Sequence, residues 1–434
     1  MSKSKSPLSR SEKSLYAVSA AAVSLFIGFA LFNSSRNSDP QINFPTPVTR
    51  PKPNGYNFYV AAAKATVRFT PEHDPMSDTN MLTIGSPAYK QRYSLARRKA
   101  WMKVNGKMLA LFQKAKQTPT MSYDMREDFS GNKGKFGILR QLARDNTSIA
   151  RMYQMEHRPF AAAQTVLDGM QMGNGISKNG TVLNRLVGIA IIAISRSALE
   201  DFNVTINQLN ASEAKTLATR LETIIANQPK FKDVLEEERW VSLRNFQRIM
   251  KQAGWRSFSS DPTMDVTWSQ RLAAQIISKQ QIVNNINRSF DEAITQCKLP
   301  YSQCKTFNLP DDLSKLFSLQ PINGIRMNEA RSNVGLDLLL LRLALRAYKV
   351  ENGIYPASLS ALAPKYLKTI PTDDYGDYNP YFYRLKNGNF ELWSVGADGK
   401  NDNGKPLTRQ NANPNFQVSD VFQEDGDFVA GKNR

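Results

Sequence analysis

The longest uncharged apolar run in the chain lies near its beginning. Leu15 to Phe32 contains 18 residues without a charge. As a helix this run spans about 27 Å, close to the thickness of a bilayer's hydrocarbon core. Positive residues, which stay on the cytoplasmic side of a membrane, precede it at Lys3, Lys5, Arg10 and Lys13. We therefore predict a cytoplasmic basic tail at 1–14 and a single-pass transmembrane anchor at 15–32, with the rest of the chain outside the cytoplasm.

A cleaved signal peptide is the alternative to this anchor. Its apolar core is usually shorter, and its cleavage site needs small residues at positions −3 and −1. The sequence from Ala30 to Ser35 reads Ala-Leu-Phe-Asn-Ser-Ser and fits that requirement poorly. Repeated prolines follow at Pro40, Pro45, Pro47, Pro51 and Pro53. They predict a stiff, extended linker at 33–54.

The middle of the chain has the apolar spacing of amphipathic helices. From Phe136 to Met172 the apolar residues recur three and four positions apart. Pro159 interrupts this pattern, which predicts two antiparallel helices. The other expected helices are Asn54–Arg68, Ala88–Lys116, Thr181–Phe202, Ser212–Asn227, Phe231–Ala253, Met264–Gln296 and Pro310–Leu319. We predict an all-α extracytoplasmic domain of helical hairpins at 55–325.

The segment Thr181–Phe202 is apolar enough to be considered as a second membrane span. It contains Arg185 and Arg196. A membrane span here would have to place the charge of Arg185 in the hydrocarbon core, or be too short to cross the bilayer. We therefore predict that it is the central helix of a soluble bundle.

The last hundred residues combine helical and strand patterns. Ala330–Val350 is apolar on nearly all sides, so we expect a long helix covered by other elements. A short helix is expected at Ala357–Leu367. Tyr381–Leu385 and Phe390–Ser394 alternate around an Asn-Gly pair, which is a strong signal for a β-hairpin.

A string of short motifs accompanies these elements. It runs Asn352-Gly353, Tyr355-Pro356, Asp373-Asp374-Tyr375-Gly376 and Ser394-Val395-Gly396-Ala397-Asp398-Gly399. The string resembles the soluble head of the major pseudopilin of type II secretion systems, over about residues 326–430. The resemblance implies a small α+β domain at 326–434, with a long helix and an antiparallel hairpin. The fold class expected for the whole chain is thus mainly α.

The sequence departs from that family in two places. Asp373-Asp374-Tyr375-Gly376 stands where the family has Asp-Pro-Trp-Gly. Gly28-Phe29 resembles a prepilin processing site, but it closes the apolar run, whereas in a prepilin the site opens it. We expect that this protein is not processed or assembled like a pilin.

The loop after the hairpin is rich in oxygen-bearing side chains. Pseudopilins of this type bind calcium in the equivalent loop, and the resemblance implies a structural calcium ion here. Carried over, the ligands are Asp398 and Asp402, with Asn401 and Asn403 weaker, and Asp420 or Asp427 is a candidate to complete the shell. A metal-free loop held by Asx turns is the alternative.

The two cysteines of the chain, Cys297 and Cys304, have six residues between them. They cannot by themselves fill a four-ligand zinc site. In an exported compartment this spacing predicts a disulfide that closes the loop 298–303. Two free thiols are the alternative.

The formal net charge of +19 is unevenly distributed. Residues 55–329 contain 37 Lys and Arg against 24 Asp and Glu, an excess of 13, whereas residues 330–434 contain 13 against 12. Such a surface attracts anionic polymers, although charge runs usually indicate a solvated surface. Aromatic residues are sparse in the densest basic patch, around 97–107, and we do not expect nucleic acid as a partner.

We find no catalytic constellation in the sequence. The two histidines match no metal motif. Ser212-Glu213-Ala214-Lys215 matches the S-x-x-K motif of penicillin-binding enzymes, but its companion motifs are absent, and Asn210 or Ser212 also suits a helix N-cap. Glu236-Glu237-Glu238 predicts a solvated helix face.

These observations predict a non-catalytic binding or assembly protein of the bacterial envelope. It would be anchored in the inner membrane with its bulk in the periplasm, and would contact envelope proteins or anionic envelope polymers. One alternative is an accessory subunit of a type II secretion or pilus-like apparatus. A second is a periplasmic cell-wall or protein hydrolase. The sequence does not predict the oligomeric state.

Overall fold

The computed structural model describes residues 38–68, 94–126, 133–200, 203–251, 277–305, 322–406 and 426–430. The predicted anchor at 15–32, the predicted helix Pro310–Leu319 and the candidate ligand Asp420 lie outside these residues. The chain divides into two compact units. The first comprises 1–45, 242–291 and 308–320, and the second comprises 46–241, 292–307 and 321–434.

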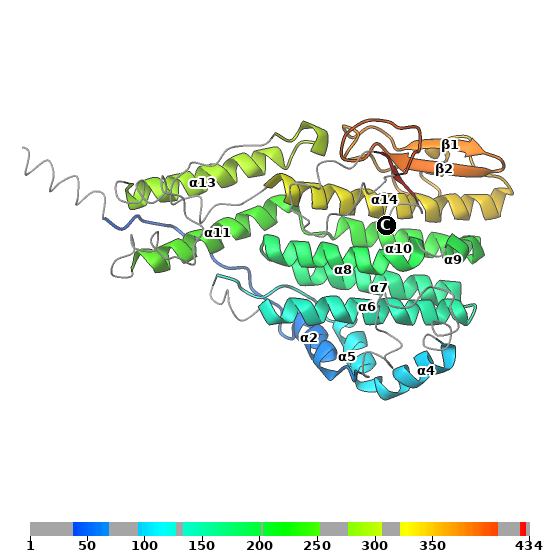
Figure 1. The fold of residues 1–434 in the computed structure, drawn as a ribbon, viewed down its shortest axis with the longest axis horizontal. Helices are drawn as coiled ribbons and strands as arrows, with labels where there is room; N and C mark the ends of the chain where they lie inside the picture. The colour runs from blue at the N-terminus through cyan, green and yellow to red at the C-terminus, as the bar shows by residue number, and fades with distance from the viewer. Residues whose placement is uncertain are drawn as a thin grey trace, which may run out of the picture. The chain divides into compact units, whose positions relative to one another are not determined.

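The described residues are mainly helical, as predicted (Figure 1). The α-helices are α2 (Gly55–Ala65), α4 (Leu95–Val104), α5 (Gly106–Gln117), α6 (Lys133–Met155), α7 (Pro159–Ser177), α8 (Val182–Glu200), α9 (Asn203–Gln208), α10 (Ala211–Ala226), α11 (Phe231–Met250), α13 (Lys279–Gln296) and α14 (Ile322–Asn352). Short 3-10 helices lie at η2 (Tyr301–Gln303) and η4 (Leu359–Leu362). The residues of α11 and α13 are shared between the two units.

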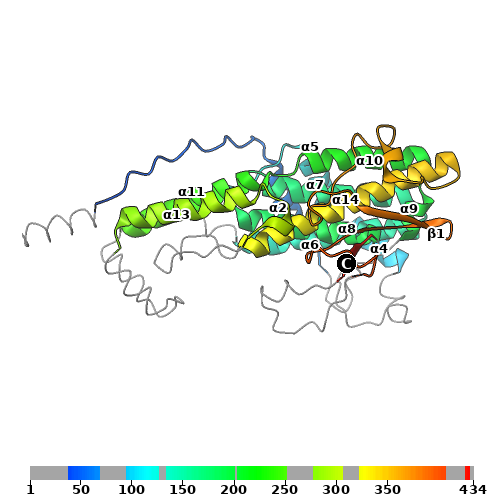
Figure 2. The same cartoon turned by 90° about the horizontal axis from the view of Figure 1, so that it is seen from above.

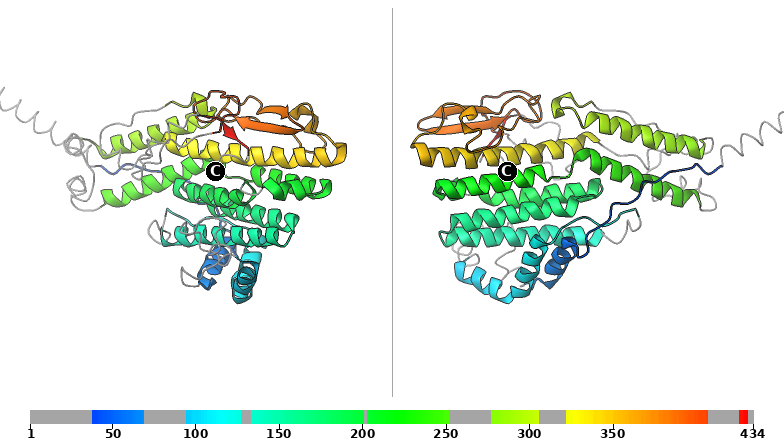
Figure 3. Two further views of the ribbon diagram at one scale, coloured as in Figure 1. Left: turned by 45° about the vertical axis from the view of Figure 1, so that its right-hand side comes forward. Right: turned by 180° about the vertical axis from the view of Figure 1, so that it is seen from behind.

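The second unit is a stack of helices covered by a small sheet. Helices α6, α7 and α8 pack against one another, α2 packs on α5 and α6, and α10 packs on both α7 and α14. Figures 1 and 3 show α14 lying between this stack and the β-hairpin.

Proline and asparagine residues set the helix breaks in this stack. Helix α7 begins at Pro159, and His157 in the preceding turn has a φ of 59°, which confirms the predicted antiparallel pair. The single helix predicted at Ala88–Lys116 is wrong within the described residues, because α4 and α5 are separate. Asn105 lies between them, and its side chain donates to the carbonyls of Val67 and Trp101.

Helix α8 is the core helix that its two arginines predicted. In the described part of the chain, Val182–Leu199 is long and apolar enough to cross a membrane, but 67% of it is buried inside the protein. Arg185 is fully buried, and its Nε and Nη2 atoms donate to the two Glu329 carboxylate oxygens at 2.8 and 2.7 Å. Such a paired arginine suits a protein interior.

Helix α14 is covered on several sides, as its pattern predicted. Its leucines from Leu336 to Leu345 are all buried. They share one apolar core with Leu217 and Leu221 of α10 and with Leu392 of the sheet. Gly335 of α14 permits close packing on α8, because a Cβ atom there would lie 1.0 Å from a guanidinium nitrogen of Arg196. The predicted domain boundary between 325 and 326 falls within α14, and elements before and after it in the chain contribute to this core.

The sheet has three antiparallel strands in the order β1-β2-β3. The predicted hairpin is confirmed as β1 (Phe382–Lys386) and β2 (Asn389–Ser394), and its turn residues Asn387 and Gly388 both have positive φ. Strand β3 (Phe428–Val429) was not predicted, because two residues are too few to show the alternation of apolar and polar side chains that marks a strand. The predicted helix Ala357–Leu367 is reduced to η4.

The prediction of a solvated face at Glu236–Glu238 is wrong. Glu237 accepts two hydrogen bonds from Arg126, at 2.8 and 2.6 Å. Glu238 accepts from the Val182 backbone amide at 2.8 Å, at the first turn of α8, and burial raises the pKa of its carboxyl. Both acids thus fix neighbouring segments within the second unit.

The first unit contains the linker end and parts of α11 and α13. Lys279 pairs with Asp39 at 2.5 Å, and the guanidinium of Arg244 lies 4.2 Å from the ring centre of Phe44. Phe246 and Phe290 are buried. The structure describes the predicted linker over 38–54, and these contacts join its first part, 38–45, to α11 and α13. Figure 2 shows this segment as an extended trace.

Candidate functional site

The loop predicted to bind calcium follows β2 directly and is built from Asx turns. Asp398 accepts a hydrogen bond from the Lys400 amide at 3.1 Å. Asn401 accepts from the Asn403 amide and from the Trp393 indole, both at 3.0 Å. Asn403 has a φ of 57°, a conformation that asparagine tolerates. Two of the four predicted ligands therefore already bond to their own backbone.

Asp427 closes this loop. Its carboxylate is fully buried and accepts from the Asp402 and Gly404 amides at 3.1 and 2.6 Å. Burial raises the pKa of Asp427, and the negative charges of Asp402 and Asp398 raise it further. The buried Asp427 carboxylate thus holds the backbone of the loop at Asp402 and Gly404.

Metal binding is not established by this geometry. Within the described ranges, no group of three or more His, Cys, Asp or Glu residues is arranged to hold a metal ion. The loop has the Asx turns that the metal-free interpretation predicts. Calcium binding stays a prediction. Asp427 was named as a candidate ligand, but its role as the anchor of the loop was not predicted, because it depends on a strand only two residues long.

The motif Asp373-Asp374-Tyr375-Gly376 forms a second ordered turn beside the hairpin. One carboxylate oxygen of Asp373 accepts from the Tyr375 amide at 3.0 Å and from the Ser394 hydroxyl at 2.8 Å, and the other accepts from the Val395 amide at 3.2 Å. Burial raises the pKa of Asp373, which these bonds oppose. The turn is thereby fixed to the end of β2.

The neighbouring carboxylate connects this turn to α14. Asp374 accepts from both terminal nitrogens of Arg326, at 2.9 and 2.5 Å. Arg326 also donates to the Leu299 carbonyl at 3.1 Å, and the Tyr301 amide donates to the Asp374 carbonyl at 2.9 Å. A bidentate, nearly buried pair of this kind fixes geometry as well as charge.

The cysteines lie on the segment that this ion pair holds. Both are free thiols in the structure and are half-buried. The Cys297 thiol donates to the Ile294 carbonyl at 3.0 Å, and burial raises the pKa of both thiols. The structure therefore agrees with the alternative of two free thiols. The disulfide between Cys297 and Cys304 stays a prediction.

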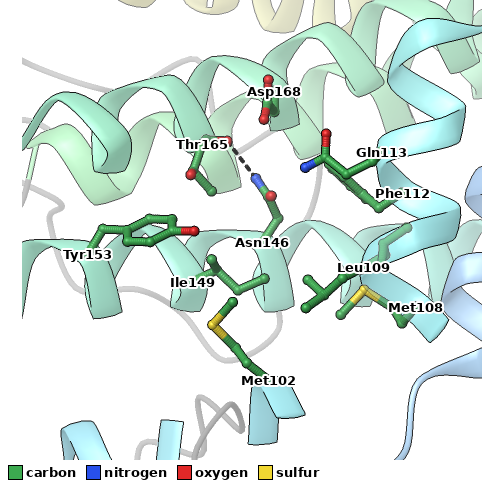
Figure 4. Close-up of a pocket in the computed structure, with 11 residues that line it drawn as sticks. Met102, Met108, Leu109, Phe112, Gln113, Asn146, Ile149, Tyr153, Thr165 and Asp168 are labelled. Atoms are coloured by element: carbon green, nitrogen blue, oxygen red, sulfur yellow. Dashed lines mark hydrogen bonds between the residues drawn. The ribbon is translucent and has the colours of Figure 1, made fainter. Parts of the chain in front are cut away.

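A cavity of about 150 Å³ lies between α4, α5, α6 and α7 (Figure 4). Met102, Leu109 and Ile149 line its apolar part, and Asn146 at one side donates to the Thr165 carbonyl at 2.7 Å. The sequence did not reveal it, because its lining has the same spacing as an ordinary helix core. A cavity of this size can hold a small apolar group.

The remaining chemical candidates have structural roles. Asn210 and Glu213 form a reciprocal capping box at the start of α10, with both bonds at 2.9 Å. Lys215 pairs with Glu351 of α14. The Ser212–Lys215 motif is therefore the first turn of a capped helix, as the capping interpretation predicted.

A comparison with known proteins supports a pseudopilin-like region. The chain is similar to the type II secretion system core protein G of Pseudomonas aeruginosa, with 37% identity over 83 residues. The similarity covers 15% of this chain and 57% of that protein, so the chain spans little more than half the length of the relative it matches. No family model matches the chain, and no solved structure matches it.

Proposed function

We propose that this protein is a non-catalytic binding or assembly protein of the bacterial envelope, tethered by the segment 15–32, whose role is related to type II secretion. Its similarity to a secretion-system core protein supports the last point. The anchor is supported by the length of the apolar run and its basic flank.

The observation that carries this proposal is the burial of α14 within its own chain. Leu339, Leu343 and Leu345 of this helix are at most 1% exposed, because α8 and α10 cover one side and the sheet lies over the other. The leucines from Leu336 to Leu345 are therefore not available for packing against copies of this helix. The pseudopilin-like region would therefore act as a fixed module of a larger protein and would not form a filament.

We further propose that calcium stabilises the loop after β2, with Asp398 and Asp402 as ligands and Asn401 and Asn403 as weaker ones. The oxygen-rich composition of the loop supports this proposal, and so does the buried Asp427 carboxylate, which accepts hydrogen bonds from the Asp402 and Gly404 amides.

Site-specific photo-crosslinking in the native host tests the proposed role. A photoreactive residue at Leu385, which is 50% exposed on the hairpin, would report partners of the pseudopilin-like region. A residue at Lys107, exposed on α5, is the matched control. We expect crosslinks from position 385 to an inner-membrane component of the secretion apparatus and none from position 107. Incorporation of the chain into pseudopilus fragments would overturn the proposal, and so would the absence of any secretion component among the crosslinked proteins.

The hydrolase alternative is tested separately. Full-length protein incubated with purified cell wall, or with an unfolded protein substrate, should release no products. Turnover of either substrate would contradict the non-catalytic part of the proposal.

A further inference from the structure

A second, more polar cavity lies in the second unit, between the turn that joins α10 to α11 and the face of α14. Its volume is about 410 Å³. Ile225, Pro229 and Phe231 from the turn form an apolar wall. The rest of the lining is mostly polar and comes from Gln228 and Lys230 of the same turn, from Cys297, from α14 and from the turn that begins at Thr372. The cavity thus offers an apolar side and a charged side to one ligand.

Most of the charged groups in this cavity are already paired. Arg326 is bound by Asp374 through two hydrogen bonds, and Glu329 is bound by Arg185 in the same manner. Each pair is nearly neutral as a unit. Lys230 lines the cavity and is itself exposed to solvent. The buried guanidinium groups of Arg326 and Arg185 are therefore not available to bind an anionic ligand.

Asp337 of α14 is the exception. One of its oxygens accepts from the Tyr381 hydroxyl at 3.0 Å, and among the described residues no cation pairs with it. Burial raises the pKa of Asp337 to about 7, the negative charges of Asp374 and Asp373 act in the same direction, and the Tyr381 bond opposes them. An unpaired carboxylate beside a cavity is costly for the folded protein and attracts a cation.

We propose that this cavity binds an organic monocation, with a primary ammonium group paired to Asp337 and an apolar part packed against Ile225, Pro229 and Phe231. An ammonium group has three hydrogen-bond donors, and Asn333 and Thr372 supply further acceptor oxygens in the lining. A divalent metal ion fits less well, since the described residues here provide no cluster of three metal-ligating side chains.

Binding should depend on pH through Asp337. The charged or titratable groups around it are Tyr381, Asp373, Asp374, Arg326, Glu329, Lys230, Tyr378 and Cys297. The ammonium ligand pairs with the ionised carboxylate, whose population rises about tenfold from pH 6 to pH 8 for a pKa near 7. The apparent affinity should rise by about the same factor.

Calorimetric titration of the full-length protein in detergent tests this proposal, with benzylamine as the probe and benzyl alcohol as its neutral counterpart. At pH 8 we expect benzylamine to bind and benzyl alcohol to bind at least tenfold more weakly. Asp337→Asn keeps an acceptor for Tyr381 and should weaken benzylamine binding at least tenfold. Asp377→Asn, in the neighbouring turn outside the cavity lining, should leave it unchanged.

Equal affinity for the amine and the alcohol would overturn the proposal, as would benzylamine binding that is the same at pH 6 and pH 8. Both comparisons use the wild-type protein, so they remain decisive even if Asp337→Asn fails to fold. Equal binding by a folded Asp337→Asn variant would also overturn it.

Discussion

The aspartates of the C-terminal part have different environments, although the residue type is the same at each position. Asp373 and Asp427 are buried acceptors for backbone amides, Asp374 is paired with Arg326, and Asp398 caps its own turn. The sequence predicted the oxygen-rich loop, but it could not separate these roles. Each role depends on which amide or guanidinium lies within hydrogen-bond distance of the carboxylate, and for Asp373, Asp374 and Asp427 a partner lies more than twenty residues away in the chain.

Calcium binding is the prediction that belongs to this scale. Adding calcium to the full-length protein should raise its thermal unfolding midpoint, because an ion bound by the folded loop and not by the unfolded chain stabilises the folded state. At a hundredfold excess over the dissociation constant the gain would be about 2.7 kcal/mol. Asp402→Asn should abolish the shift, which differential scanning calorimetry would measure.

Asp377→Asn is the matched control for this experiment, since Asp377 accepts hydrogen bonds from Gln303 and Ser302 outside the loop. It should retain the full calcium response. A wild-type protein whose unfolding midpoint does not change in millimolar calcium would exclude the proposed ion.

At the scale of elements, the helices that the sequence predicted are those with long periodic patterns and clear caps. The break before Pro159 and the start of α10 at Asn210 were both readable, because each depends on a residue with a local physical effect. The break at Asn105 could not be predicted from the sequence. There, the side chain bonds to Val67, nearly forty residues away, and this contact competes with continuation of the helix.

The capping box of α10 gives a prediction about stability. Asn210→Ala removes the acceptor for the Glu213 amide and should lower the free energy of unfolding by about 1 kcal/mol. Ser212→Ala is the control, because Ser212 is exposed and is not the N-cap, and it should change stability by less than about 0.5 kcal/mol. Chemical denaturation of the two variants measures both values. A larger loss in Ser212→Ala than in Asn210→Ala would show that the cap is misassigned.

At the scale of the whole chain, the sequence predicted a helical domain followed by a separate α+β domain, and the structure joins the two in one core. The pattern of α14 indicated a covered helix but did not show what covers it. The answer lies in Leu217 and Leu221 of α10, whose own periodicity marks them only as core residues. The spacing of apolar residues shows that one face of a helix is buried, but it does not specify which element packs against that face. The shared core could therefore not be predicted from the sequence.

The burial of α14 in its own chain is the central claim of this account, and hydrogen–deuterium exchange measures it most directly. We expect the backbone amides of residues 336–345 in the full-length protein to exchange slowly, at a rate that is independent of protein concentration. Rapid exchange of these amides in the dilute protein, with protection that appears only when copies associate, would contradict the claim.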